Sequence, residues 1–542
     1  MVPFDSLLFG GLQNKQAFYS KGEILGPDIG TPGKLPRLFQ EDGPPNKINT
    51  TDHIESQNNF HNLDALFLDT TSQFRSYDQM QELADIESQY SELIKPHAQA
   101  KGIETSSHDA VHYEVSERKL STDAIIRLGG ERFIQSSSSS SVNDISMPSH
   151  PYSTSFSGLS DQEVKDVELI ENLLLSAEKV TQQQFERSTK LLDWCDVLSP
   201  SLGNPIQRLV HYFSKSLREK IDGETGRVSV RGSGKKQVDE IEARMMSPNP
   251  TTISVYQSLP FFQAGHFSGV QSLVDGVAGA THVHIIDLSI KHGIHGTILM
   301  QALKSQHNCP IKHLKITAVG NNHKQKIEHT GDRLKNFAES INLSFTFHVV
   351  VVEDMLDFKK ELFELDPDEA LAVHSSHGLW SMISHQDRLE SLMKGIKSFN
   401  PRVMVVSEAV ANLNSPNFVN RFIEALFFYG ALFDSLEDCM GREDENRVIA
   451  ESMYFGRGIR SCVAAEGEER AIRHVNLDVW RKFFARFGMK EIELSMSALY
   501  QANLMAEKLP CGSSCSLDMD GNSLLIGWKG TPIQCVSAWT FS

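Results

Sequence analysis

The chain is poor in cysteine and has no long apolar run. Its 542 residues include only 7 scattered cysteines, an odd number, and no basic segment opens the sequence ahead of an apolar one. A membrane helix needs roughly 18 consecutive apolar residues, and no stretch approaches that length. These absences argue against a disulfide-stapled secreted protein and against a membrane protein. They predict an intracellular chain whose thiols are reduced.

Basic charge is also scarce. The sequence has 52 Lys and Arg residues against 69 Asp and Glu residues, and its formal net charge is −17. This balance disfavours nonspecific attraction of the whole molecule to phosphate groups, so direct DNA binding would need a local basic patch. The nearest approach to one is Arg231, Lys235 and Lys236, in a stretch rich in Gly and Ser that is more typical of a solvated loop.

The composition divides the chain at about residue 158. Residues 1–158 are rich in Ser, Gln, Asn, Pro and acidic residues, which predicts a disordered regulatory region. Two apolar islands interrupt it. Residues 60–68 mix apolar and acidic side chains like segments that fold on a partner, and residues 120–134 resemble a short capped helix, with a plain linker as the alternative for both. Residues 159–542 are predicted to form the folded domain.

Apolar residues recur at spacings of three and four from residue 161 onward. This period is typical of amphipathic helices, and it predicts a mainly helical cap over residues 159–255. The apolar faces supply more surface than one core layer needs, so they are candidates for partner binding, with burial inside the cap as the alternative. The residues concerned are Leu169, Leu173, Ile206, Leu209, Phe213 and Leu217.

Strands and helices alternate through residues 256–542. Short apolar runs, each typical of a buried strand, occupy residues 283–286, 314–319, 345–352, 370–374 and 403–407. Such strands separated by helices predict an α/β fold with a doubly wound, mostly parallel sheet covered on both faces, which is the Rossmann-like plan. A helix near residues 480–487 and the short strands around it predict antiparallel strands that close the sheet.

Asp287 ends the first of these strands, where a doubly wound sheet places its ligand contacts. An enzyme that binds a dinucleotide or S-adenosylmethionine would follow this strand with closely spaced glycines, because only glycine lets the backbone approach the cofactor. This chain offers only Gly293 and Gly296, which come late. We therefore predict no bound cofactor and a structural role for Asp287.

Patterns for catalysis and for metal binding are also missing. The sequence has no G-x-S-x-G string for a nucleophile on a strand-to-helix turn. His282 and His284 are two apart on a predicted strand and would share one face, but no second cluster completes a ligand set. Cys511 and Cys515 have three intervening residues, where zinc knuckles have two. We predict structural histidines, no metal site and no catalytic residue.

Two short motifs bracket the α/β region. One resembles the VHIID signature of the GRAS family of plant transcription regulators and comprises Val283, His284, Ile285, Ile286 and Asp287. The other resembles the family's SAW signature and comprises Ser537, Ala538 and Trp539. Arg421 and Glu424 fall in a stretch similar to the family's PFYRE region, and the ordered agreement covers roughly residues 161–541. We expect Trp539, on a terminal strand, to anchor the chain end in the fold.

The chain departs from the family pattern after the first motif. His295 and Gly296 stand where the family usually has Gln-Trp, so the packing of a tryptophan is lost there. A DELLA motif is also missing from the sequence, and we expect a member of a different branch from the gibberellin-regulated one. Contacts borrowed from other family members are therefore not transferred to this part of the chain.

The resemblance implies a methyltransferase-like Rossmann core with a helical cap and a non-enzymatic transcription regulator or co-regulator in the nucleus. Its expected partners are other transcription factors, including other GRAS proteins in homo- or heterodimers, through which DNA is reached indirectly. Two alternatives stay open. One is an enzyme that uses S-adenosylmethionine, and the other is a factor that binds specific DNA sequences directly through a basic groove between cap and core.

Overall fold

A computed structural model describes residues 120–138, 158–227, 233–246, 248–306, 309–320 and 323–541. The apolar island at residues 60–68 and the basic residue Arg231 lie outside this part of the chain. Within the described residues, none of the helices has the length and apolar composition needed to cross a membrane.

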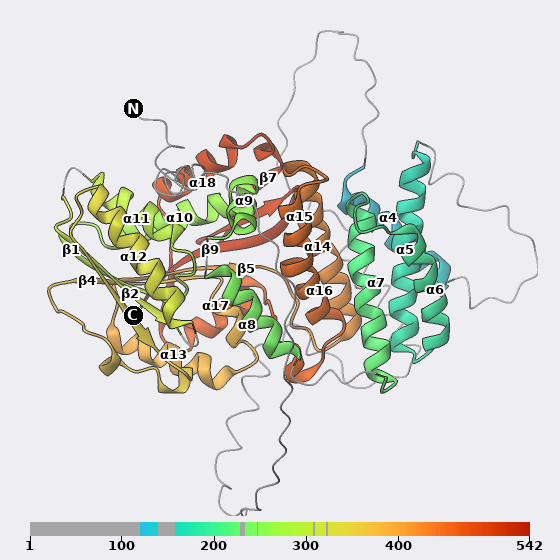
Figure 1. Ribbon diagram of the computed structural model, residues 1–542, viewed down its shortest axis with the longest axis horizontal. Helices are drawn as coiled ribbons and strands as arrows, with labels where there is room; N and C mark the ends of the chain where they lie inside the picture. Colours follow the sequence, from blue (N-terminus) through green and yellow to red (C-terminus); the bar gives the residue numbers. More distant parts are fainter. Residues whose placement is uncertain are drawn as a thin grey trace, which may run out of the picture. The chain divides into compact units, whose positions relative to one another are not determined.

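A nine-stranded sheet forms the core (Figure 1). Its parallel half has the strand order β3-β2-β1-β4-β5. Successive strands are added toward one edge from β1 to β3 and toward the other edge from β4, so the order changes direction between β1 and β4. All five strands confirm the runs predicted from the sequence, but β3 lies at the edge of the sheet and is only half-buried, whereas the sequence predicted a buried strand. These strands are β1 (His282–Asp287), β2 (His313–Gly320), β3 (Phe345–Val351), β4 (Ala370–Ser376) and β5 (Val403–Ala409).

Antiparallel strands from the end of the chain extend the sheet, as predicted. β9 pairs with β5, β8 pairs with β9, and β7 forms the outer edge, while β6 pairs with another part of β9. The doubly wound fold class is confirmed. These strands are β6 (Met489–Ile492), β7 (Cys515–Asp520), β8 (Ser523–Trp528) and β9 (Thr531–Phe541).

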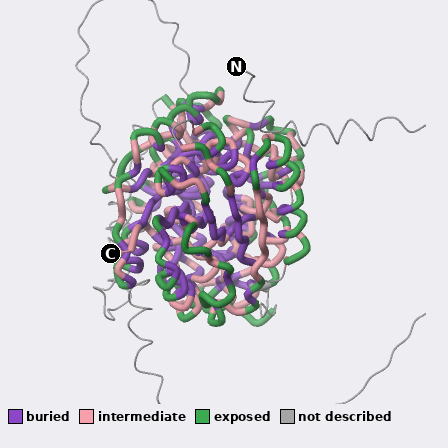
Figure 2. Tube along the Cα trace, turned by 90° about the vertical axis from the view of Figure 1, so that its left-hand side faces the viewer, coloured by how far each residue is buried: buried purple, intermediate pink, exposed green. Residues whose placement is uncertain are grey.

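Helices cover both faces of the sheet, as Figures 1 and 2 show with the buried strands inside. On one side lie α10 (Pro260–Gly276), α11 (Ile294–Lys304), α12 (Lys324–Ser340) and α18 (Met496–Lys508). On the other side lie α13 (Gln386–Phe399) and α17 (Leu477–Ala485). Pro260 begins α10 directly after α9 (Pro250–Ser258), so two separate helices precede β1.

The helical cap draws on two distant segments of the chain. Four helices come from before residue 225, namely α4 (Thr122–Ser138), α5 (Asp161–Thr181), α6 (Phe185–Leu198) and α7 (Pro205–Glu224). The helices α4, α5 and α7 pack against α14 (Phe418–Cys439), and α7 also packs against α16 (Gly456–Val463), while α6 packs on α5 and α7. Sequence periodicity placed the cap in residues 159–255 alone, because local spacing does not identify a packing partner about 200 residues away. The other elements of the described residues are α8 (Ser233–Met245), α15 (Glu445–Ala450), five 3-10 turns (Met355–Asp357, Lys360–Leu362, Trp380–Met382, Gly467–Glu469 and Gly512–Ser514) and one π-helical turn (Glu451–Phe455).

Capping residues fix the starts of the main cap helices. Ser160 and Glu163 form a reciprocal capping box at α5, and Asn204 and Gln207 form another at α7. The side-chain amide of Asn204 also donates to Asp166 at 2.7 Å, so the start of α7 is tied to the first turns of α5. These bonds satisfy backbone N–H groups that a helix start leaves free.

α4 confirms the helix predicted near residues 120–134, and it lies before the predicted domain boundary at residue 158. Its side chains Ile125, Ile126 and Phe133 are at most 3% exposed. The Thr122 hydroxyl donates to Asp434 on α14 at 2.6 Å. The packed structure therefore includes a segment from the region expected to be disordered.

Trp539 anchors the end of the chain in the sheet, as expected. It lies opposite Met404 in the pairing of β9 with β5 and is 2% exposed. Its ring centroid is 4.8 Å from that of Phe484 on α17, and its indole N–H donates to the Ser537 hydroxyl at 2.9 Å. The SAW motif thus joins the terminal strand to the middle of the sheet.

A fragment of residues 120–541 should be more stable than one of residues 159–541. Removing α4 exposes the apolar surface against which its buried side chains pack, which lowers stability. The conformational entropy gained by releasing the helix offsets part of that loss. We expect the free energy of unfolding to fall by about 2 to 5 kcal/mol in urea denaturation. Equal midpoints for the two fragments would show that α4 adds nothing to the fold.

Trp539→Ala should lower the free energy of unfolding by about 3 to 5 kcal/mol, because a fully buried ring is removed. Trp539→Phe serves as the matched control, since it keeps an aromatic ring against Phe484 and should lose less. Chemical denaturation measures both. An unchanged midpoint for the alanine variant would contradict the role of the ring as an anchor.

Candidate functional site

The carboxylate of Asp287 lies at the carboxyl end of β1 and binds three neighbours. One oxygen accepts a hydrogen bond from the backbone N–H of Ser289 at 2.8 Å. The other lies 2.6 Å from Nε2 of His295 on α11 and 3.0 Å from Nδ1 of His374 on β4. The Asp287 residue is 2% exposed. This cluster, which we call the Asp287 cluster, joins two strands and a helix.

The protonation of the Asp287 cluster follows from its geometry. Burial raises the pKa of Asp287, but the imidazoles of His295 and His374 together hold it below its usual range, so the carboxylate is ionised. Burial lowers the pKa of His374 more than Asp287 raises it. Because an ionised carboxylate only accepts hydrogen bonds, the imidazole nitrogens that face it carry the protons.

The same three residues have donor atoms within 4.8 Å of one another, a spacing that a divalent cation can bridge. In the structure, direct hydrogen bonds join them instead. His282 and His284, two residues apart on β1, do not form one metal site. His282 is exposed, whereas buried His284 lies 2.8 Å from the Thr317 hydroxyl.

Sequence reasoning missed the Asp287 cluster because its members are far apart in the chain. His374 is 87 residues from Asp287 and becomes its neighbour only when β4 pairs with β1. His295 offered a signal, since it stands where the family usually has glutamine. His295, the residue that departs from the family pattern, contacts the Asp287 carboxylate at the end of the VHIID motif.

The two late glycines serve the packing of α11 on α12. Gly293 has a φ of 77°, and a Cβ there would lie 2.7 Å from a methyl carbon of Thr330. A Cβ on Gly296 would lie 3.1 Å from a methyl carbon of Leu334, because the Leu334 side chain of α12 fills the space beside α11 at this point. Both glycines therefore allow α11 to pack closely against α12.

The remaining residues of the VHIID motif are core residues of β1. Val283, Ile285 and Ile286 are at most 1% exposed. His284 is also buried, and desolvation lowers its pKa to about 3, so it is neutral at pH 7. The motif therefore acts as a buried strand whose last residue is bonded to its neighbours.

Arg421 and Glu424 on α14 have structural partners. Arg421 is fully buried and donates to the backbone oxygens of Cys462 and Ser415, each at 2.7 Å, and to the Glu466 carboxylate at 2.6 Å. Burial raises the pKa of Glu424, and a hydrogen bond from the backbone of Asn412 lowers it by less. Both residues hold α14 against the loops beside it.

The six candidates for partner binding in the cap are all buried, and this prediction is corrected. Each is at most 1% exposed, because the cap helices pack on one another and on α14 and α16 over the faces that sequence spacing left unassigned. They form the cap's own core, and the residues are Leu169, Leu173, Ile206, Leu209, Phe213 and Leu217. Exposed apolar side chains in the cap lie instead on and after α6, at Trp194, Val197 and Leu202.

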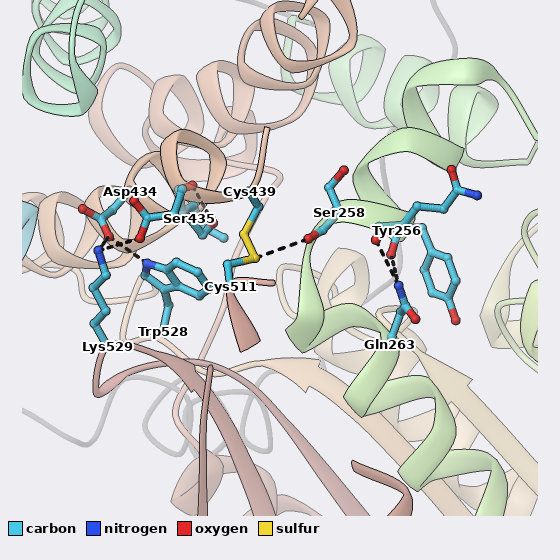
Figure 3. The surroundings of a disulfide bond; sticks show 12 residues. Tyr256, Ser258, Gln263, Asp434, Ser435, Cys439, Cys511, Trp528 and Lys529 are labelled. Carbon is cyan, nitrogen blue, oxygen red and sulfur yellow. Dashed lines mark hydrogen bonds and ion pairs between the residues drawn. A yellow bond between two sulfur atoms is a disulfide. The ribbon is translucent and has the colours of Figure 1, made fainter. Parts of the chain in front are cut away.

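α14 is fastened to the last strands by a polar contact and a disulfide (Figure 3). Asp434 accepts a hydrogen bond from the indole N–H of Trp528 at 2.8 Å and pairs with the Lys529 ammonium at 2.6 Å. Cys439, at the end of the helix, is bonded to Cys511, which lies 72 residues later. The expectation that all thiols are free is therefore corrected for this pair, whose partners only the fold brings together.

Comparison with known proteins identifies the family. The model of the GRAS domain family matches residues 169–540. The chain belongs to the GRAS domain family. It is 30% identical to the DELLA protein RGL1 of Arabidopsis thaliana over 70% of this chain and 71% of that protein. It is 31% identical to Scarecrow-like protein 18 of the same species over 68% of this chain and 90% of that protein.

A solved structure shows the same fold. The crystal structure of SCL7 from Oryza sativa superposes with a TM-score of 0.60 at 24% identity, over 68% of this chain and 99% of that one. GRAS membership, with DELLA and Scarecrow-like relatives, gives the chain a role in transcription regulation. The family resemblance read from the VHIID and SAW motifs is confirmed.

Asp287→Ala should destabilise the domain by about 3 to 5 kcal/mol, because it leaves two buried imidazoles and a backbone N–H without their acceptor. Asp287→Asn keeps the shape and one acceptor oxygen and should lose less. Asp332→Ala, at an exposed position on α12, is the control. Urea denaturation measures all three.

A loss of stability that is large for Asp287→Ala, smaller for Asp287→Asn and absent for Asp332→Ala supports hydrogen bonding within the Asp287 cluster. A melting temperature that falls on treatment of the unmodified protein with a chelator would instead show a bound cation. Wild-type stability for Asp287→Ala would contradict the structural role of the carboxylate.

Proposed function

We propose that this protein is a non-enzymatic transcription regulator or co-regulator that acts in the nucleus by binding other transcription factors. The observation that carries this proposal is the match of the GRAS family model across residues 169–540. Relatives at 30% identity or above include a DELLA protein and a Scarecrow-like protein. Their shared role in regulation supports the same role here.

The chemistry of the carboxyl edge supports a scaffold over an enzyme. The Asp287 carboxylate accepts three hydrogen bonds from the protein itself. Gly293 and Gly296 lie against α12. An enzyme that uses S-adenosylmethionine would need a free carboxylate and an open glycine turn at this point of the fold. In this protein the carboxylate is hydrogen-bonded within the fold, and the glycines pack against α12.

Charge supports contact with DNA through partners. The net charge of −17 opposes close approach to a duplex by most of the surface. Association with a second transcription factor, including another GRAS protein in a homo- or heterodimer, supplies the DNA contact without a basic groove on this chain.

We assign the partner surface of the cap to the outer side of α6. Val197 is 80% exposed and Trp194 36%, and because they are three residues apart they share a helix face. Leu202, in the turn that follows, is 58% exposed. Large exposed apolar side chains that gather on one helix end are typical of protein interfaces. This surface, named the α6 face, replaces the buried leucines as the proposed interface.

The double variant Val197→Asp with Leu202→Asp should weaken binding to a second GRAS protein by at least about tenfold, or 1.4 kcal/mol, because charges are placed in an apolar contact. The double variant should retain the wild-type melting temperature, since both side chains are exposed. Met496→Asp on α18 is the matched control, at a residue that is 78% exposed on a helix that packs against α10. Biosensor titration against the purified partner gives the affinities.

Undiminished binding by the double variant would place the interface away from the α6 face. The non-enzymatic part of the proposal has its own test, a calorimetric titration with S-adenosylmethionine. Saturable binding there, together with methyl transfer, would contradict it. Duplex binding by the chain alone with a steep salt dependence would favour direct DNA recognition instead.

A further inference from the structure

A cavity of about 530 Å³ opens at the carboxyl edge of the parallel strands. Its wall includes residues that follow or end four strands, namely Ser289 after β1, Gly320 of β2, Glu353 after β3 and His377 after β4. The strand order reverses between β1 and β4, and doubly wound sheets bind ligands at such a reversal. The volume falls within the range of small-molecule sites.

We propose that this cavity binds a small organic cation, an amine-bearing molecule with an apolar body. The proposal goes beyond the regulatory role, since it assigns a ligand to the core of the protein and not to the α6 face. It is argued from the charge, the rigidity and the apolar surface of the wall.

The wall is rich in carboxyl groups. Six acidic residues line it, against the two basic residues Lys291 and Arg388. Arg388 is occupied, because its guanidinium makes two hydrogen bonds of 2.8 and 2.9 Å to the Asp354 carboxylate. The ammonium of Lys291 donates to the backbone oxygen of Ser376 at 2.8 Å. Among the described residues that line the cavity, acidic residues therefore outnumber basic ones, an imbalance that attracts a cation.

Two of these carboxyl groups lie together on α8. Asp239 and Glu242 are three residues apart and therefore share a helix face that borders the cavity. Burial, followed by the charge of Asp239, raises the pKa of Glu242, and the charge of the Lys291 ammonium lowers it by less. A pair of close carboxyl groups repel each other when both are ionised. An ammonium group bound between them would relieve this repulsion.

α8 is held in place at the mouth of the cavity. The Lys326 ammonium on α12 donates to the backbone oxygen of Ala243 at 2.8 Å. On its other side, the Arg457 guanidinium pairs with Glu240. Contacts from two directions fix the carboxyl pair relative to the sheet, and such preorganisation lowers the cost of binding.

The opposite wall is apolar and rigid. Trp380 is 8% exposed, and its indole N–H donates to the backbone oxygen of His377 at 3.0 Å. Leu288, Met382 and Leu392 also line the cavity. His377 and Lys291 both have left-handed backbone conformations, with φ values of 50° and 47°. Non-glycine residues in this region carry strain that is common at binding sites. An aromatic ring and apolar side chains beside carboxylates suit an apolar body with a positive end.

The test titrates the full-length protein with tryptamine and with indole-3-propionate, which share an indole ring and carry opposite charges. Ligand-detected NMR measures both affinities. We expect saturable binding of tryptamine and at least about tenfold weaker binding of the anion, equivalent to 1.4 kcal/mol. Binding of tryptamine should weaken as salt is added, because the attraction is partly electrostatic.

Two variants locate the site. Asp239→Asn and Glu242→Gln should each weaken tryptamine by at least about threefold, and together by at least about tenfold, or 1.4 kcal/mol. Glu339→Gln, at an exposed acidic residue outside the cavity, is the control and should bind as the wild type does. Thermal melts confirm that the variants are folded. A lack of saturable tryptamine binding, equal affinity for the anion, or unchanged affinity in the folded double variant would each overturn the proposal.

Discussion

The hydrogen bonds to the Asp287 carboxylate are the interaction on which the carboxyl edge of the sheet depends. A buried carboxylate costs several kcal/mol unless donors replace the water it has lost. Here those donors come from three places in the chain, the loop after β1, the helix α11 and the strand β4. None of these segments can shift without leaving a buried charge or a buried imidazole unsatisfied. The charge therefore fixes the end of the central strand relative to its neighbours.

This constraint connects the fold to the proposed regulatory role. The position that a cofactor enzyme uses for ligand recognition is used here for cohesion, and the nearby glycines allow two helices to pack closely. The cap is held in a similar way, since fully buried Arg421 bonds to three separate partners. A core fixed in this manner is suited to hold surface helices in place, and the exposed apolar side chains Trp194, Val197 and Leu202 lie together on the α6 face.

Much of the fold was predictable from the sequence, because buried parallel strands are apolar along their whole length and Val283–Ile286 is typical of them. The helices of the cap were also predictable, but the exposure of their faces was not. Leu169 and Phe213 have the spacing of an amphipathic surface, yet both are buried among the cap helices, and Phe213 packs against Phe422 of α14 from later in the chain. The Asp287 cluster and the cavity share that difficulty, since their residues meet only at the ends of strands paired out of sequence order. Disulfide partners such as Cys439 and Cys511 likewise become neighbours only in the fold.

Nitrogen NMR of the histidine side chains tests the central claim most directly. Protein labelled with ¹⁵N-histidine reports which ring nitrogen of His295 and His374 carries a proton, and His295→Gln and His374→Asn assign the signals. The account predicts a proton on Nε2 of His295 and on Nδ1 of His374 at neutral pH, each directed at Asp287. Unprotonated nitrogens at these two positions, as in rings that bind a metal or lack the carboxylate as a partner, would contradict it.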